Sequence, residues 1–130
     1  MPHRARMACA GASFALGLVV ALSIARADDD PNRVQFLTSC GTCHSTEPGA
    51  SPRQGPNLFG VYGRKAGALD GFKYSDALKS ADWVWDEGRL DKWIENAQAM
   101  RPGVVMPYRQ ADPAKRAKVI EYLKSLKAAP

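Results

Sequence analysis

The chain has 130 residues, a length that fits a single domain, and its Lys and Arg residues exceed its Asp and Glu residues by five. Three basic residues but no acidic residue precede position 28, so removal of the first 27 residues would lower the net charge from +5 to +2. So small a positive net charge, with no motif of interleaved aromatic and basic residues, argues against nucleic-acid binding.

The N-terminal segment has the three parts of a secretory signal peptide. A basic start precedes an apolar stretch from Met7 to Ile24, and Ala25-Arg26-Ala27 supplies the small residues of a cleavage site. An uncleaved membrane anchor is the alternative, because the stretch is almost long enough to span a bilayer, but glycine and serine dilute it. We therefore predict a cleaved signal peptide over 1–27, a single mature domain over 28–130 and a periplasmic location.

The mature region is expected to begin with a helix that leads into a compact cysteine motif. Asp30-Pro31 is typical of a helix start, because it combines an N-cap carboxylate with a proline in the first turn. Cys40-Gly41-Thr42-Cys43-His44 follows. At this spacing two thiols can add to the two vinyl groups of one haem, while the adjacent imidazole reaches the iron.

Two other uses of these cysteines fit the sequence less well. A structural zinc site would lack its fourth ligand, since Cys40, Cys43 and His44 are the only Cys and His residues after position 27. A thioredoxin-like dithiol would follow a strand, whereas the residues before Cys40 indicate a helix. The motif therefore predicts one haem c, held by two thioether bonds, with His44 as an iron ligand.

Further along the chain, the sequence predicts helices separated by long loops. Residues 47–71 are dense in glycine and proline and are expected to form an ordered loop. N-cap and proline signals predict a helical turn over 75–79, a helix from 86 to about 97, and a last helix from 112 onward. No segment alternates with period two, so the predicted class is all-α. The apolar face of the last helix is formed by Val119, Tyr122, Leu123 and Leu126.

The second iron ligand has few candidates, because no further histidine or free cysteine follows residue 44. Met100, Met106, a lysine and an open position remain. Met100 is expected at the end of a helix, where packing is sufficient to explain it. Met106 lies in a loop bounded by Pro102 and Pro107, and such a loop can approach a haem face closely. We therefore favour Met106.

Motifs across the whole mature region carry a family resemblance. In chain order they are Cys-Gly-Thr-Cys-His (40–44), Gly-Pro-Asn-Leu (55–58), Gly-Arg-Lys (63–65), Gly-Phe-Lys-Tyr-Ser-Asp-Ala (71–77), Leu-Asp-Lys-Trp-Ile-Glu-Asn (90–96), Pro-Gly-Val-Val-Met (102–106) and Glu-Tyr-Leu-Lys (121–124). With these motifs, the chain resembles class I c-type cytochromes of the mitochondrial cytochrome c and bacterial cytochrome c2 type. The resemblance implies a cytochrome c fold, with three main helices, short helical turns and long loops around one covalently bound haem. It also implies that Phe36 packs on Tyr122 where the first and last helices cross.

The resemblance further implies roles for residues around the haem. The Pro56 carbonyl would accept the proton of the His44 ring nitrogen that is not bound to iron. Met106 matches the second axial ligand, and Trp93 stands near its sulfur, where the family usually has a tyrosine. Hydrogen bonds to a haem propionate would come from Arg64, Tyr74, Ser75 and Trp85.

The predicted function is that of a soluble periplasmic electron carrier rather than an enzyme. A monomer would shuttle single electrons between redox protein partners, such as membrane electron-transfer complexes, oxidases or periplasmic dehydrogenases, with transient proximity to a membrane surface. Several lysines that ring the haem edge in the mitochondrial proteins are replaced here, for example by Val105. The way in which the mitochondrial proteins recognise their redox partners therefore does not carry over to this chain. The alternatives are a dedicated cytochrome subunit of one periplasmic complex, and a haem enzyme or gas sensor with a labile distal position.

Overall fold

A computed structural model describes residues 30–127, which form helices joined by long loops. The predicted signal peptide lies outside the described residues. Extended backbone within 30–127 pairs only in an isolated antiparallel bridge between Lys65 and Val84, so the predicted all-α class is confirmed. No helix in this range combines the length and the apolarity needed to cross a membrane. The helices are α1 (Pro31–Ser39), α2 (Asp76–Lys79), α3 (Glu87–Met100) and α4 (Pro113–Ser125).

Each helix begins directly after a capping residue that the sequence predicts. The side chain of each capping residue accepts a hydrogen bond from a backbone N–H of the first turn, which would otherwise lack a partner. Prolines begin α1 and α4, where a missing N–H costs nothing. The capping residues are Asp30, Ser75, Asp86 and Asp112.

The C-terminal end of α3 differs from the sequence prediction. The helix continues past Ala97 to Met100, but Asn96 has φ −164° and ψ 93°, which interrupts it. The Asn96 side chain accepts a hydrogen bond of 3.1 Å from the Ala99 N–H and so starts the additional turn. The Ile94 carbonyl accepts instead from the Gln110 N–H, at 3.0 Å. The interruption thereby ties α3 to the segment that precedes α4.

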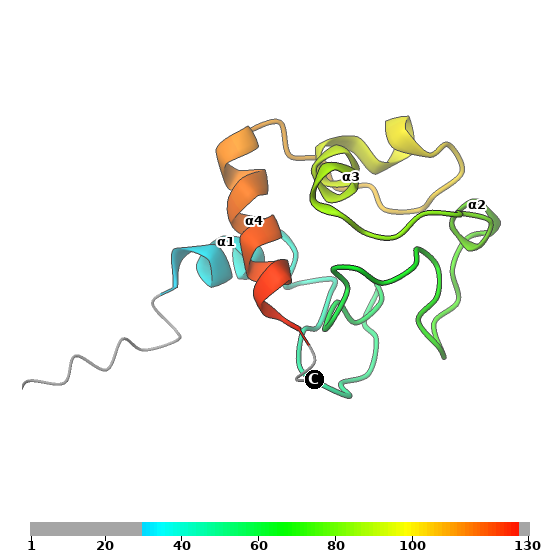
Figure 1. Cartoon of the computed structure of the whole chain (residues 1–130), viewed down its shortest axis with the longest axis horizontal. Coiled ribbons are helices and arrows are strands. Elements are labelled where there is room, and N and C mark those ends of the chain that lie inside the picture. Colours follow the sequence, from blue (N-terminus) through cyan, green and yellow to red (C-terminus); the bar gives the residue numbers. More distant parts are fainter. Residues whose placement is uncertain (1–29, 128–130) are drawn as a thin grey trace, which may run out of the picture.

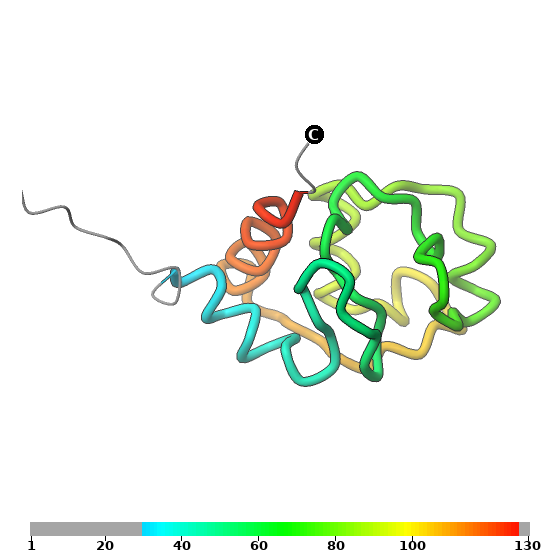
Figure 2. Tube along the Cα trace, turned by 90° about the horizontal axis from the view of Figure 1, so that it is seen from below, coloured from blue at the N-terminus to red at the C-terminus, as the bar shows by residue number. Residues whose placement is uncertain are grey.

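Helices α1 and α4 build the core at one end of the molecule (Figure 1). Both α1 and α3 pack on α4. Phe36 of α1 is 1% exposed, and its ring centroid lies 5.0 Å from that of Tyr122 on α4, as the resemblance implies. Figure 2 shows α1 and α4 again at one end, with α2 at the opposite end and the long loops between them.

A short antiparallel pairing holds the long central loop against the chain that leads into α3. The Gly63 N–H donates to the Trp85 carbonyl at 2.8 Å, and the Trp85 N–H donates to the Arg64 carbonyl at 2.9 Å. The Ala66 N–H donates to the Trp83 carbonyl, also at 2.9 Å. This pairing brings Arg64 and Trp85 together from positions about twenty residues apart in the sequence.

Candidate haem site

A largely apolar cavity of about 450 Å³ lies among the loops and helices α3 and α4. Its volume falls within the range of roughly 300–1,000 Å³ that is usual for ligand and cofactor sites. The lining includes every site residue that the sequence analysis named. These residues are Cys40, Cys43, His44, Pro56, Arg64, Tyr74, Ser75, Trp85, Trp93 and Met106.

The cysteine motif forms a tight turn directly after α1. The Cys40 N–H donates to the Phe36 carbonyl at 2.7 Å, and the His44 N–H donates to the Cys40 carbonyl at 2.9 Å. Neither Cys40 nor Cys43 forms a disulfide within the described residues. Burial, with a smaller contribution from Cys43, raises the pKa of Cys40 to about 12. Because a reactive thiolate depends on a lowered thiol pKa, Cys40 is poorly suited to disulfide exchange.

The His44 ring is oriented by a backbone carbonyl. Its Nδ1 lies 2.8 Å from the Pro56 oxygen, so the tautomer with a proton on Nδ1 donates this bond and leaves Nε2 free to bind a metal. Burial lowers the pKa of His44, although the hydrogen bond to Pro56 acts in the opposite direction. The neutral imidazole that metal binding requires is therefore favoured.

Gly55 leaves the space that the His44 ring occupies. A Cβ at this position would lie 2.7 Å from Nδ1 and 2.8 Å from Nε2, and closer still to Cε1. The absence of a side chain at Gly55 is therefore a condition for the observed orientation of His44. Gly55 belongs to the matching motif at residues 55–58, which by itself assigns it no role, and its position next to Pro56 was the available signal.

Pro56→Ala tests how strongly the local loop aims the carbonyl at His44. The variant keeps the acceptor oxygen but loses the rigid ring of proline. We expect the holoprotein to retain its haem, with a lower reduction potential and weaker axial ligation than the wild type. Voltammetry and visible spectra would measure both properties. A potential equal to that of the wild type would show that this loop does not tune the iron.

Hydrogen-bond donors gather at another part of the cavity wall. Arg64 donates to the carbonyls of Phe59 and Asn57, each at 3.1 Å, which uses two of the five N–H groups of a guanidinium. Burial raises the pKa of Tyr74, with Arg64 opposing the shift, so the phenol keeps the proton that it can donate. Ser75 also caps α2, because its Oγ accepts from the Leu78 N–H at 3.3 Å. These groups could hold a carboxylate.

The two methionines lie in different environments. Met106 is part of the cavity lining, whereas Met100 lies at the end of α3 and contributes to a separate depression on the surface of that helix. Trp93, which shares the cavity wall with Met106, packs edge-on against Trp85, with ring centroids 5.0 Å apart and an interplanar angle of 67°. The tryptophan pair thus forms an aromatic part of the wall.

Comparison with known proteins agrees with this geometry. The sequence model of the cytochrome c family matches residues 33–127. The chain belongs to the cytochrome c family. Cytochrome c2 of Rhodomicrobium vannielii is 41% identical over 107 residues, which cover 82% of this chain and 86% of that protein. Cytochrome c2 iso-2 of Magnetospirillum fulvum is 47% identical over 88 residues, or 67% of this chain and 91% of that protein.

A third relative is cytochrome c-550 of Novispirillum itersonii, which is 40% identical over 100 residues, covering 68% of this chain and 90% of that protein. Family membership confirms the predicted class I c-type cytochrome and its fold. Haem c, bound covalently and in one copy, is the cofactor of this family, and Cys40 and Cys43 are present for it. The cavity, with its thiols, its oriented imidazole and its cluster of donors, fits such a group.

Proposed function

We propose that this cytochrome is a soluble periplasmic electron carrier, with His44 and Met106 as the two iron ligands, and that it is not an enzyme. The observation that carries the proposal is the shared cavity: His44, both thiols and Met106 line it, and Met100 does not. Haem bound there supplies a one-electron Fe(II)/Fe(III) couple. Two protein ligands leave no open position for a substrate, and a thioether favours the reduced state.

The surrounding residues have supporting roles in this proposal. Pro56 and Gly55 together hold the His44 imidazole in one orientation and tautomer. Apolar side chains of α3 and α4 line the cavity and would keep water away from a haem bound there, which would limit the structural change that accompanies a change of iron charge. Arg64 and Tyr74, together with Ser75 and Trp85, would fix the propionates through hydrogen bonds.

Contact with redox partners is proposed at the mouth of the cavity. Val105, which adjoins Met106, also lines the cavity, and it is 81% exposed. Pro107 and Tyr108 continue the same segment of the lining. A small, partly apolar contact surface of this kind suits the brief encounters of a monomeric carrier with membrane complexes, oxidases or dehydrogenases. A permanently bound cytochrome subunit would instead need a larger apolar interface.

Electron carriage is tested with the purified holoprotein. We expect the reduced protein not to bind carbon monoxide at neutral pH, because both axial positions are filled. We also expect it to exchange electrons rapidly with periplasmic or membrane fractions and to purify without a stoichiometric partner. Carbon monoxide binding would favour a haem enzyme or gas sensor, and stable co-purification with one complex would favour a dedicated subunit.

Covalent attachment and export are tested by the mass of the isolated protein and by extraction of its haem. Protein isolated from the periplasm should begin at Asp28 and weigh one haem more than the chain 28–130. Its colour should also survive denaturation and acid–acetone extraction, because two thioether bonds hold the haem. Haem that passes into the solvent would contradict thioether attachment, and a retained N-terminal segment would contradict cleavage after Ala27.

A further inference from the structure

The segment that carries Met106 has no regular structure of its own. Between the end of α3 at Met100 and the start of α4 at Pro113, the chain forms neither helix nor strand. The position of the Met106 thioether therefore depends on the burial of Val104, which is 6% exposed, and on how the two ends of this segment are attached to the rest of the fold. Each end is attached by an arginine side chain.

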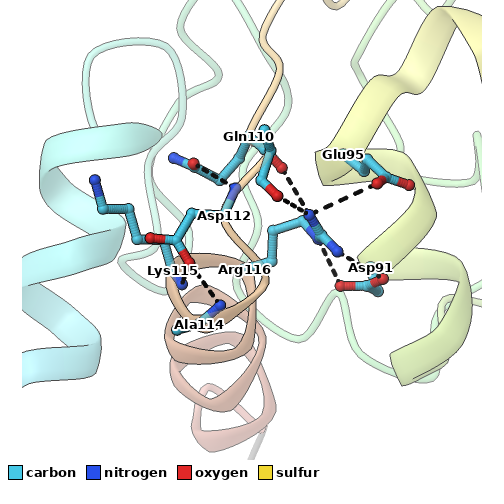
Figure 3. Close-up of polar contacts among 8 residues, drawn as sticks. Asp91, Glu95, Gln110, Asp112, Ala114, Lys115 and Arg116 are labelled. Carbon is cyan, nitrogen blue, oxygen red and sulfur yellow. Dashed lines mark hydrogen bonds and ion pairs between the residues drawn. The ribbon is translucent and has the colours of Figure 1, made fainter.

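Arg116 of α4 holds the C-terminal end of the segment (Figure 3). Its Nη1 donates to the carbonyls of Gln110 and Ala111, each at 2.9 Å. The Gln110 N–H donates in turn to the Ile94 carbonyl, at the interruption of α3. Three hydrogen bonds thus fix two consecutive residues, only four or five positions after Met106.

The guanidinium of Arg116 is itself held by carboxylates of α3, as Figure 3 shows. Its Nε lies 2.7 Å from Asp91 Oδ1 and its Nη2 lies 3.4 Å from Asp91 Oδ2, a two-point contact. Its Nη1 is 3.8 Å from Glu95 Oε1. Arg116 is only 7% exposed, and such charged hydrogen bonds are stronger than neutral ones. Arg116 therefore links the Met106 segment to the helix that carries Trp93 and forms part of the cavity wall.

Arg101 holds the N-terminal end of the segment. Its Nε donates to the Ala77 carbonyl at 3.0 Å and its Nη2 donates to Ser80 Oγ at 2.9 Å. The guanidinium also lies 5.7 Å from the centroid of the Trp83 ring, within the range of a cation–π contact. Because this side chain is more exposed than Arg116, its contacts are screened by water and should contribute less.

We propose that Arg116, with Arg101 as the weaker second anchor, is a positioning residue that keeps Met106 on the iron by clamping the ends of its loop. This inference rests on the proposed ligation by Met106. Loops of this kind open locally at a free energy below that of global unfolding. Loss of a clamp should therefore raise the frequency at which Met106 leaves the iron, without an equal loss of global stability.

The test uses the oxidised holoprotein with cyanide as the probe. At saturating cyanide and neutral pH, the rate of binding equals the rate at which Met106 leaves the iron. We expect Arg116→Met to raise this rate on the order of tenfold or more, since several charged hydrogen bonds are lost. Arg101→Met should raise it less. Amide exchange at Gln110 should accelerate in parallel in Arg116→Met, because this N–H is part of the clamp.

Two control variants separate a clamp from general destabilisation. Lys124→Met removes an ion pair with Glu87 that also joins α3 to α4 but has no hydrogen bond to the Met106 segment, so its cyanide rate should match that of the wild type. Phe36→Leu lowers global stability at the crossing of α1 and α4, away from the segment. If Arg116→Met binds cyanide no faster than a Phe36→Leu protein of equal stability to urea, the clamp does not exist.

Asp91→Asn keeps the inference testable if Arg116→Met fails to fold. This variant leaves the guanidinium in place and removes the nearer of the two carboxylate charges that orient it, while that of Glu95 remains, so a rate increase of a few-fold is expected. An unchanged rate would overturn the inference. A wild-type oxidised protein without the weak red-end absorption of a thioether–iron(III) bond would instead overturn ligation by Met106 itself, and so the two failures are distinguishable.

Discussion

Replacing Met106 with alanine should abolish the weak absorption at the red end of the visible spectrum that marks sulfur ligation of oxidised haem iron. The same variant should bind carbon monoxide when reduced, because one axial position is no longer filled by the protein. Its reduction potential should fall by on the order of a hundred millivolts or more, within the range of roughly 0.8 V over which axial ligands set haem potentials. Spectra, carbon monoxide titration and voltammetry measure the three effects.

Met100→Ala is the matched control for this prediction. Met100 is partly buried at the end of α3 and lies outside the cavity lining. Its truncation should leave the band, the carbon monoxide response and the potential nearly unchanged, and cost at most about 2 kcal/mol of packing. If Met100 proved essential and Met106 dispensable, the ligand assignment would be wrong, and the propionate donors assigned with it would lose their support.

Gly55→Ala should have the second large effect, although it adds only one methyl group. The new Cβ would overlap the His44 ring, so either the imidazole must turn or the loop that carries Pro56 must move away. Both changes weaken the bond from Nδ1 to the Pro56 carbonyl. We expect a low yield of holoprotein, loss of part of the low-spin spectrum and a destabilisation of about 1–3 kcal/mol, the usual cost of overpacking.

Gly88→Ala provides the comparison for that variant. Gly88 lies in the first turn of α3, and a Cβ there would meet only the Asp86 side chain, at 3.7 Å. Replacing a helical glycine that has room for a side chain should stabilise the protein by about 0.4–1 kcal/mol and leave the haem spectrum unchanged. Thermal unfolding and visible spectra of the two variants test the pair. A Gly55→Ala protein with the stability and spectrum of wild type would rule out the proposed steric role.

The positions of the helices were accessible from local sequence signals. An N-cap side chain acts on backbone N–H groups two or three residues away, so Asp86 and Asp112 mark the starts of α3 and α4 without reference to the fold. The break at Asn96 was not accessible in this way. It depends on a distant backbone group, the Gln110 N–H, which offers the Ile94 carbonyl a partner outside the helix.

The sequence by itself also determined the cofactor chemistry, because Cys40, Cys43 and His44 lie within five residues and their spacing specifies haem c. The preference for Met106 over Met100 followed from the prolines at positions 102 and 107, which bound the loop of Met106. Roles for residues such as Arg64 and Trp85 came only with the family resemblance, since a lone arginine or tryptophan carries no spacing signal.

Only the tertiary structure decided how the proposed iron ligands are held. The need for glycine at position 55 arises from a ring eleven residues earlier in the chain, and the proposed clamp on the Met106 segment uses a hydrogen bond between Asp91 and Arg116, 25 residues apart. Such contacts depend on the packing of loops and helices against one another, which no local pattern encodes. Composition and spacing therefore specify which chemistry is present, and long-range packing sets the geometry in which that chemistry operates.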